Sequence, residues 1–360
     1  MKIQNINIQD YKVFKNFNIN FLNTENEVLD LVVLAGINGS GKTTLFEFIT
    51  DIINYDDSNV DGSIELNTEE LTLNHYNLPK ILNFRGHISH KLNELYAEKA
   101  VEVGEVLWKK IIYFKVSVNQ KEKVIKQIKN FIDMIKDNNE ELTIKAANQK
   151  AVNEINSIFD GLVLKTKFKG ISKDIKRDIL FENDVKEDIK LDELSTGEQQ
   201  LFIRALSLKM MGLQDSIILI DEPEISLHPN WQNHILRVYQ NIAKDGDNQL
   251  IIATHSPQIV SSAPNESLRV LVKNGTDIEV KSFDKSYGAE IEEVLADFMD
   301  TKYLRTPEVA KKVQKMWDCL HNQDLDNFEK VYKELVNILD LNDKDLVLAR
   351  LEKAKQLSLK

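Results

Sequence analysis

A glycine-rich loop, GINGSGKTT at residues 36–44, constrains the fold of this chain more than any other feature. The apolar run LDLVVLA precedes the loop at 29–35, and residues 42–53 have the composition of a helix. The loop fits the pattern G-x-x-x-x-G-K-[ST] in the strand–loop–helix setting that this pattern requires. It therefore predicts an α/β domain in which the preceding strand belongs to a mostly parallel sheet.

The residue types of the loop are those of a phosphate cradle. Glycines allow backbone N–H groups to point at phosphate oxygens, and the start of the following helix adds the positive end of its dipole. We expect Lys42 to bridge the β- and γ-phosphates of ATP and the hydroxyl of Thr43 to bind Mg²⁺. The residues predicted to bind ATP are Gly36, Asn38, Gly39, Ser40, Gly41, Lys42, Thr43 and Thr44.

Two later segments carry the groups that such a cradle needs for hydrolysis. IILIDEPE at 217–224 ends an apolar strand with Asp221, expected to hold Mg²⁺ through water, and Glu222, expected to orient the attacking water. ATHSP at 253–257 places His255 directly after another apolar strand. We predict that His255 senses the γ-phosphate, and that Glu222 and His255 are the catalytic residues.

With LSTGEQQ at 194–200 added, the segments occur in the order found in ATP-binding cassette (ABC) ATPases, which the chain resembles. In that family the signature segment of one subunit caps the γ-phosphate of ATP held by the other. The resemblance implies a head-to-tail homodimer around two Mg·ATP, with the signature acting in trans. The signature residues are Ser195, Thr196, Gly197 and Glu198.

Within that superfamily, DEPEISLHPNWQ at 221–232 is similar to the SMC, RecF and OLD group. The opening strand, with Tyr11, Lys12 and Phe14, also fits the start of that group. Across residues 105–270 the chain resembles the stand-alone ATPases of bacterial anti-phage systems of the Septu and retron-associated types. This narrower resemblance implies a partner effector, an HNH-type nuclease.

The chain departs from the cassette pattern after the strand-like run IIYFKVSV at 111–118, where no convincing glutamine loop follows. Gln120 is the best-placed candidate for a third Mg²⁺ ligand, and Asn119 is its rival. After the Asp-Glu pair, residues 226–229 read SLHP, whereas many cassettes have SALD in this segment. Whether Ser226 and His228 contact the partner's nucleotide is therefore left undecided.

The order of strand-like and helix-like runs predicts an α/β domain with a largely parallel sheet, one helical insert and one helical tail. The resemblance implies that this domain is an ABC-type ATPase head. The chain is long enough for one large domain and a smaller one. The expected parts are an ATPase lobe over 1–118, an insert with a return strand over 119–180, the second half of the ATPase over 181–288 and the tail over 289–360.

Smaller elements follow from residue spacing. Alternating apolar residues at 3–8 and 17–22 predict two strands around a turn. The polar segment 54–80, with a short strand near Ile64–Leu66, is expected in a peripheral antiparallel layer. Helical spacing over 119–158, broken by turn residues at 137–139, predicts two helices in the insert. The run GLVLKTKF at 161–168 predicts the strand that returns from them.

The net charge and the cysteine content limit which binding partners and which cellular compartment we expect. The net charge of −11 argues against a general polyanion binder. Residues 107–179 nevertheless hold 16 Lys and Arg against 9 Asp and Glu, so this insert could face nucleic acid or be a solvated lysine-rich lobe. The single Cys319 excludes an internal disulfide and fits a reducing cytoplasm. No run is apolar enough for a membrane span, so no membrane association is expected.

Three functions agree with these features. The first is an ATPase that dimerises around ATP and controls a partner nuclease in anti-phage defence. The second is a regulatory scaffold that keeps ATP bound and hydrolyses it slowly. The third is a DNA-repair clamp of the RecF type, which would bind DNA through Lys121, Lys123 and Lys126 of the basic insert.

Overall fold

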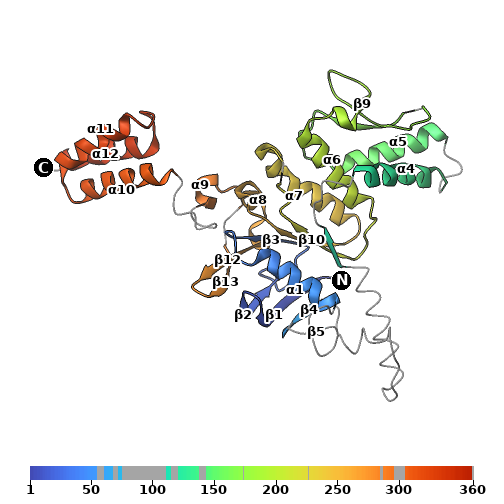
Figure 1. Cartoon of the computed structure of the whole chain (residues 1–360), viewed down its shortest axis with the longest axis horizontal. Coiled ribbons are helices and arrows are strands. Elements are labelled where there is room, and N and C mark those ends of the chain that lie inside the picture. Colours follow the sequence, from blue (N-terminus) through green and yellow to red (C-terminus); the bar gives the residue numbers. More distant parts are fainter. Residues whose placement is uncertain are drawn as a thin grey trace, which may run out of the picture. The chain divides into compact units, whose positions relative to one another are not determined.

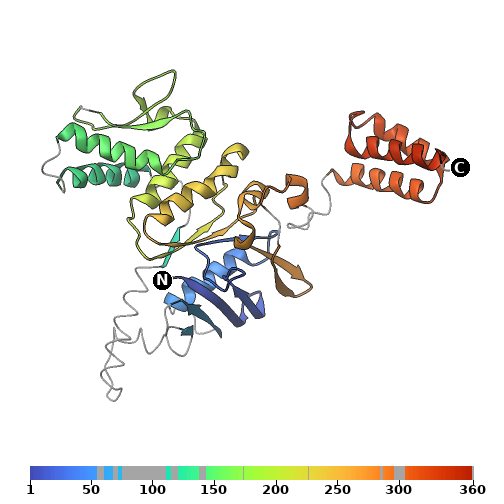
Figure 2. The same ribbon diagram turned by 180° about the vertical axis from the view of Figure 1, so that it is seen from behind.

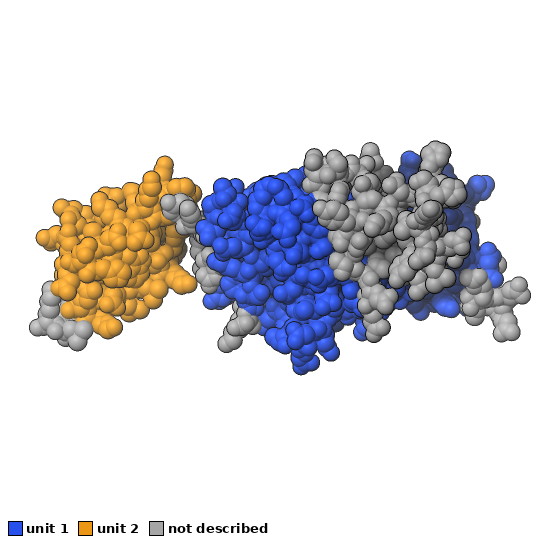
Figure 3. All heavy atoms as spheres, turned by 90° about the horizontal axis from the view of Figure 1, so that it is seen from below, with its two compact units in different colours: residues 1–294 blue, residues 295–360 orange. Residues whose placement is uncertain are grey.

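The computed structural model of the chain contains two compact units, Met1–Val294 and Leu295–Lys360, which Figure 3 colours separately. The residues described are 1–54, 61–67, 72–74, 111–114, 121–137, 143–172, 174–225, 227–283, 287–295 and 305–358. Gln120, Asn119 and Ser226 lie outside these ranges, as does the second half of the strand expected at 111–118.

A six-stranded sheet with the order β13-β12-β3-β11-β10-β6 forms the centre of the first unit (Figure 1). Its strands are β3 (Leu31–Ala35), β6 (Ile111–Phe114), β10 (Ile217–Asp221), β11 (Gln249–Ala253), β12 (Leu268–Asn274) and β13 (Asp277–Lys281). All neighbours pair in parallel except β12 and β13, which form a hairpin. The predicted mostly parallel sheet is confirmed. Strands β3 and β11 are buried along their whole length, as continuous apolar strands of such sheets usually are.

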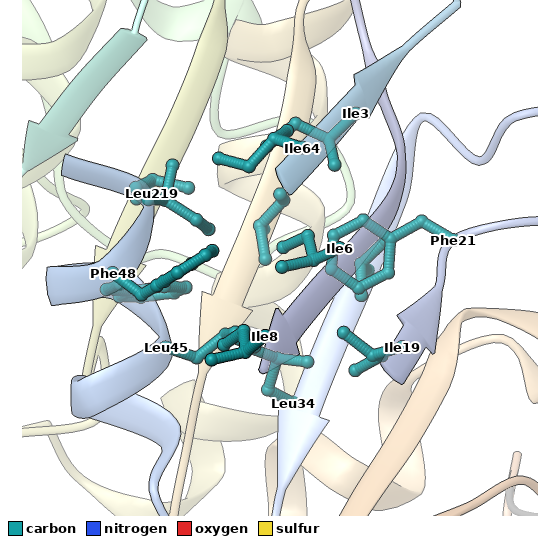
Figure 4. Packing of buried hydrophobic residues seen from close by; sticks show 14 of the residues in the cluster. Ile3, Ile6, Ile8, Ile19, Phe21, Leu34, Leu45, Phe48, Ile64 and Leu219 are labelled. Carbon is teal, nitrogen blue, oxygen red and sulfur yellow. The ribbon is translucent and has the colours of Figure 1, made fainter. Parts of the chain in front are cut away.

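A four-stranded antiparallel sheet with the order β2-β1-β4-β5 confirms the predicted peripheral layer. Its strands are β1 (Ile3–Tyr11), β2 (Phe14–Asn20), β4 (Asp61–Leu66) and β5 (Thr72–Asn74), and the helix α1 (Lys42–Asn54) belongs to the same core. Side chains of this sheet, of α1 and of the central sheet meet in one apolar cluster, shown in Figure 4. Fully buried members are Ile6, Leu34, Leu45, Phe48 and Leu219. This packing fixes α1 between the two sheets and so fixes the loop that precedes it.

The insert contains two helices and a small antiparallel sheet. The elements are α4 (Lys121–Asp137), α5 (Ile144–Ser157), β7 (Lys167–Ile171), β8 (Ile179–Glu182) and β9 (Ile189–Lys190). The two predicted helices are confirmed, because α4 ends at the turn residues and buries Val124, Ile128 and Ile132 at helical spacing.

The return strand of the insert begins six residues later than predicted. Residues 159–164 form successive turns, in which Gly161 takes a φ of +90°. The side-chain amide of Asn156 then pins Phe168: it donates to the carbonyl oxygen of Phe168 at 2.8 Å and accepts from its N–H at 2.9 Å. These contacts with α5 determine where β7 starts, and they override the strand propensity of the earlier residues.

Among the described residues, six further helices of the first unit follow the insert sheet. They are η3 (Leu191–Glu193), α6 (Thr196–Lys209), α7 (Pro229–Lys244), α8 (Pro257–Ser262), η4 (Asn265–Ser267) and α9 (Ile291–Glu293). The view from behind in Figure 2 shows α6 and α7 near each other, where they are in contact. Ser195, His228 and Ser256 cap the amino ends of α6, α7 and α8 with their side chains. Each of these helices therefore begins within or just after a segment of the predicted site.

The second unit is a bundle of α10 (Pro307–His321), α11 (Leu325–Val336) and α12 (Lys344–Ser358), so the predicted helical tail is confirmed. It has a hydrophobic core of its own, to which Met316, Phe328 and Leu346 contribute. Across the described ranges of both units, we find no helix with the length and apolar character that crossing a membrane requires.

One buried side chain joins the two large sheets. Gln249, the first residue of β11, accepts a hydrogen bond from the N–H of Ile3 at 2.7 Å. It also donates to the carbonyl oxygens of Ile3 and Leu29, both at 2.9 Å. The amide thus pairs three backbone groups that the interior would otherwise leave unpaired.

We expect Gln249→Leu to lower the free energy of unfolding by about 2–5 kcal/mol, because three buried backbone groups lose their partner. Urea denaturation measures this difference. Gln9→Leu, on the exposed side of β1, is the matched control and should stay within about 0.5 kcal/mol of the wild type. Equal stability of the two variants would contradict the role assigned to Gln249.

Candidate functional site

Three neighbouring strands of the central sheet lead into three of the predicted segments. β3 precedes the loop at 36–44, β10 ends at Asp221 and β11 leads to 254–257. In the parallel register Asp221 lies opposite Ala253. Because the carboxyl ends of parallel strands share one edge of a sheet, segments far apart in the sequence meet there.

The glycine loop curls as its sequence predicts. Gly36 and Gly41 take φ values of +145° and +95°. A Cβ atom at Gly36 would lie 2.5 Å from the carbonyl oxygen of Leu271, and one at Gly41 would lie 2.7 Å from the ring of Phe14. Both positions therefore require glycine for conformation and for space. Predicted ATP-binding residues that are open to solvent are Asn38, Gly39 and Thr43, whereas Gly36, Ser40, Gly41 and Lys42 are buried and Thr44 is half-buried.

Lys42 begins α1 with its side chain folded back into the loop. Only 4% of the residue is exposed, and its Nζ donates to the carbonyl oxygens of Gly36 at 2.8 Å and Ile37 at 3.2 Å. Burial lowers the pKa of Lys42 to about 8, and the carboxylates of residues 221–224 offset only part of this effect. A cation so poorly solvated is well suited to receive an anionic ligand.

Thr43 and Asp221 present oxygen atoms to the same point. Thr43 Oγ1 donates to Asp221 Oδ2 at 2.9 Å, and the hydroxyl of Tyr113, on β6, donates to the same oxygen at 3.0 Å. The other oxygen, Oδ1, is sealed from solvent and has no hydrogen-bond partner among the residues that the structure describes. Such an oxygen beside a hydroxyl fits a hard cation such as Mg²⁺, which would neutralise phosphate charge. Thr43 and Asp221 are the described residues that would hold it.

His255 lies between Lys42 and the predicted catalytic carboxylate. Its Nδ1 is 3.3 Å from Lys42 Nζ, and its Nε2 is 3.6 Å from Glu222 Oε1. Burial, followed by the charge of Lys42, lowers the pKa of His255 and favours the neutral imidazole. Because an ammonium can only donate, Nδ1 accepts and Nε2 carries the hydrogen that faces Glu222.

Glu222 has an uncommon backbone conformation for a non-glycine residue, with a φ of +47°. Its N–H donates to the carbonyl oxygen of Ala253 at 2.8 Å, which holds the turn after β10 against the end of β11. The side chain remains 40% exposed. The strained turn therefore leaves an accessible carboxylate next to the buried lysine and histidine.

The signature segment forms the start of α6. Ser195 caps the helix, and Glu198 returns the bond: its Oε2 accepts from the N–H of Ser195 at 3.1 Å and from its hydroxyl at 2.6 Å. Thr166 donates to the other oxygen of Glu198 at 2.7 Å. A Cβ atom at Gly197 would lie 2.9 Å from the ring of Trp231, so the indole packs on the glycine. The hydrogen bonds of Ser195 and Glu198 serve the helix and the insert, and Thr196 is the first helical residue.

Sequence reasoning missed Tyr113 and Arg204 in this region, and it recognised Glu224 as part of the motif at 221–232 without assigning it a contact. Tyr113 could have been found from its place in the strand IIYF, because that strand is parallel to β10 and places Tyr113 opposite Leu219, two residues before Asp221. Glu224 accepts from the N–H of His255 at 2.7 Å, and Arg204 donates to the carbonyl oxygen of Pro223 at 3.1 Å. No local pattern announces these last two contacts, since each joins segments distant in sequence.

Comparison with known proteins finds a family model that matches more than half of the chain, from the residues after the glycine loop onward. The model of the AAA ATPase domain family matches residues 52–260. The chain is similar to the Septu protein PtuA of Bacillus thuringiensis, with 30% identity over 124 residues that cover 33% of this chain and 30% of that protein. It is also similar to the OLD nuclease of Thermus scotoductus, with 31% identity over 94 residues that cover 26% of this chain and 18% of that protein. The matches thus span less than a third of the length of either relative.

Among solved structures, the SMC head bound to the C-terminal winged-helix domain of ScpA is similar, with a TM-score of 0.45 and 14% identity. The superposition covers 79% of this chain and 98% of that one.

Tyr113→Phe should raise the Mg²⁺ concentration needed for half-maximal binding of a fluorescent ATP analogue by roughly tenfold, because a group that orients a metal ligand is lost. Titration of Mg²⁺ at a fixed analogue concentration measures this midpoint. Tyr332→Phe, which removes a hydroxyl from the second unit, is the control. An unchanged midpoint in Tyr113→Phe would show that the hydroxyl does not orient Asp221.

The buried charge of Lys42 predicts a pH dependence of stability. Its folded-state pKa of about 8 lies below the usual 10.5, so the unfolded chain binds more protons between these values. Relative to Lys42→Met, the ligand-free wild type should therefore gain stability as the pH rises from 8 to 10.5, by up to about 3 kcal/mol. Urea denaturation across this range measures the difference, and the exposed Lys273→Met corrects for general alkaline effects. If the difference in stability between the wild type and Lys42→Met did not change with pH, the prediction would be wrong.

Proposed function

The chain belongs to the AAA ATPase domain family, and on this basis we propose that it is a Mg²⁺-dependent ATPase whose two active sites form between two copies of the chain. The observation that carries the proposal is the row Lys42–His255–Glu222 beside the Thr43–Asp221 pair, at one edge of the sheet. These are the groups that phosphoryl transfer to water requires: a cation, a metal site and a carboxylate near them.

Each residue of this row has a definite task in the proposed reaction. Lys42 exchanges its two carbonyl contacts for phosphate oxygens, where its charge is better compensated than in the loop. Glu222 accepts a hydrogen bond from the attacking water and orients it toward the γ-phosphate. His255 donates from Nε2 toward the γ-phosphate, while Lys42 holds its Nδ1. Mg²⁺, held by Thr43 and Asp221, would supply neutralisation of charge on the phosphates.

A second copy of the chain supplies the part that this edge lacks. Ser195 and Gly197 lie at the exposed or half-exposed start of α6, where the positive end of the helix dipole favours an anion. Within its own chain this helix start bonds only to itself and the insert, as far as the described residues show. We propose that it caps the γ-phosphate of ATP bound by the partner copy, in a head-to-tail homodimer.

The partner that the ATPase controls is proposed from the relatives alone. Septu PtuA and a probable ATPase of retron Vc95 from Vibrio cholerae both match short stretches of this chain. We propose that the chain acts in anti-phage defence and that its nucleotide state controls an effector, an HNH-type nuclease. ATP can control the effector only to the extent that it binds the closed and open dimers with different affinity.

The basic insert gives no support to direct binding of nucleic acid as the main function. Several of its cations already have acidic partners: Lys121 pairs with Asp192, and Arg177 contacts Asp133 at 2.8 Å. Lys169 contacts carboxylates within residues 182–188. Charges neutralised in this way release few counterions when a polyanion binds.

Glu222→Gln should give a dimer that forms only with ATP and Mg²⁺, because the variant keeps its shape but hydrolyses ATP at least about a hundredfold more slowly. Size-exclusion chromatography with and without ATP measures the change. The control is the double variant Glu222→Gln/Ser195→Arg, in which a bulky cation blocks the start of α6, and it should remain monomeric. A monomer in every condition, or a dimer indifferent to ATP, would contradict the proposal.

A further inference from the structure

A cluster of buried polar groups lies behind the turn that carries Glu222, and the proposed reaction does not use it. Arg204 comes from α6, Tyr239 comes from α7, and Glu224 follows Pro223 in the turn, and the three groups are close enough to act on one another electrostatically. Arg204 Nε, Glu224 Oε2 and Tyr239 Oη are sealed from solvent without a hydrogen-bond partner among the described residues. Interiors seldom keep so many unsatisfied groups in one place, so the cluster calls for an explanation.

Arg204 is the most unusual member of the cluster. It is 4% exposed, and apart from Ser207 the other buried residues of its helix are apolar. Burial lowers the pKa of Arg204, and the nearby Glu224 offsets only part of this loss. A guanidinium is almost never buried without a strong compensating contact, because its desolvation is costly. An apolar residue at this position would stabilise the fold more simply.

Arg204 and Glu224 each form a hydrogen bond with the backbone at or next to one of the two proposed catalytic residues, Glu222 and His255. Arg204 Nη1 donates to the carbonyl oxygen of Pro223 at 3.1 Å, directly after Glu222. Glu224 Oε1 accepts from the N–H of His255 at 2.7 Å. Arg204 therefore holds the turn that presents the carboxylate, while Glu224 holds the backbone of the histidine.

The same helix begins at the signature. Ser195 caps α6, and Arg204 lies nine residues further along, about 13 Å at the helical rise of 1.5 Å per residue. An α-helix transmits a small displacement of its start along its length with little loss, because its hydrogen bonds resist stretching. A shift of the signature on contact with the partner's nucleotide would therefore reach the carbonyl oxygen of Pro223 through Arg204.

We propose that Arg204 and Glu224 are positioning residues that join the signature helix to Glu222 and His255 of the same copy, so that closure on the partner's nucleotide sets the hydrolytic geometry at this copy's own site. The inference rests on the proposed function, and it goes further by making the two sites of the dimer depend on each other. Coupling between the sites is reciprocal for binding, and its consequence is cooperative hydrolysis with respect to ATP.

The test compares Arg204→Met with Arg269→Met. Arg269 is buried to 5% and donates to the carbonyl oxygens of Asn20 and Leu22, away from the strand ends that carry the site. Both variants replace a buried guanidinium by the same apolar side chain, so any general effect of removing a buried charge is common to both. Only Arg204→Met should lower kcat, by about tenfold, and bring the Hill coefficient for ATP from above 1 to about 1. The affinity for a fluorescent ATP analogue and ATP-driven dimerisation in the Glu222→Gln background should stay within about threefold of the wild type.

Two further variants keep the test informative if Arg204→Met folds poorly. Arg204→Lys retains the charge but not the planar fork, so it should fold and still lose cooperativity. Glu224→Gln keeps an acceptor for His255 N–H but removes the charge opposite Arg204, and the double variant with Arg204→Met should lose no more activity than either single one.

The outcomes separate this inference from its premise. If the wild type binds ATP, dimerises and hydrolyses cooperatively while the Arg204 variants match Arg269→Met in kcat and Hill coefficient, the positioning role is wrong and the ATPase proposal stands. If the wild type neither binds ATP nor dimerises with it, the proposed function itself fails, and the positioning role fails with it.

Discussion

The parallel pairing of β3 with β11, and of β11 with β10, is the constraint on which the rest of the site depends. It brings the loop at 36–44, the turn after Asp221 and His255 to one edge. The apolar cluster under α1 holds that edge rigid, since Phe48 and Leu219 are fully buried in it. Groups placed by a packed sheet need no rearrangement to face a common ligand, which is the condition for electrostatic preorganisation.

The electrostatics of this edge are incomplete without a ligand. Lys42 is a buried cation whose contacts to the chain include two carbonyl oxygens and His255, and Asp221 keeps one oxygen without a partner among the described residues. ATP with Mg²⁺ would compensate both charges: the lysine cation would gain phosphate oxygens, and the Asp221 carboxylate would gain a metal cation. The site therefore gives up some stability of the free protein in favour of ligand binding, as the low pKa of Lys42 indicates.

Much of the fold could be predicted from the sequence, because short patterns determine it locally. The strand–loop–helix around Lys42 and the paired helices of the insert follow from apolar spacing and turn residues. The start of β7 could not be predicted, because Asn156 fixes Phe168 through contacts that no strand propensity encodes. The hydrogen bond from Tyr113 to Asp221 could not be predicted from local patterns alone for a similar reason, because it forms only when β6 is aligned with β10.

The buried arginine of α6 supports a role for the signature helix beyond the proposed capping of a partner's phosphate. A helix that only presented its start would keep an apolar residue at position 204, since burial of a guanidinium costs stability. The contact of Arg204 with Pro223, and that of Glu224 with His255, place these two side chains beside both predicted catalytic groups. In the proposed head-to-tail dimer, that arrangement would let each copy sense the other's nucleotide before it hydrolyses its own. The proposed control of an effector would need this property, because hydrolysis at a half-closed dimer would release the signal too early.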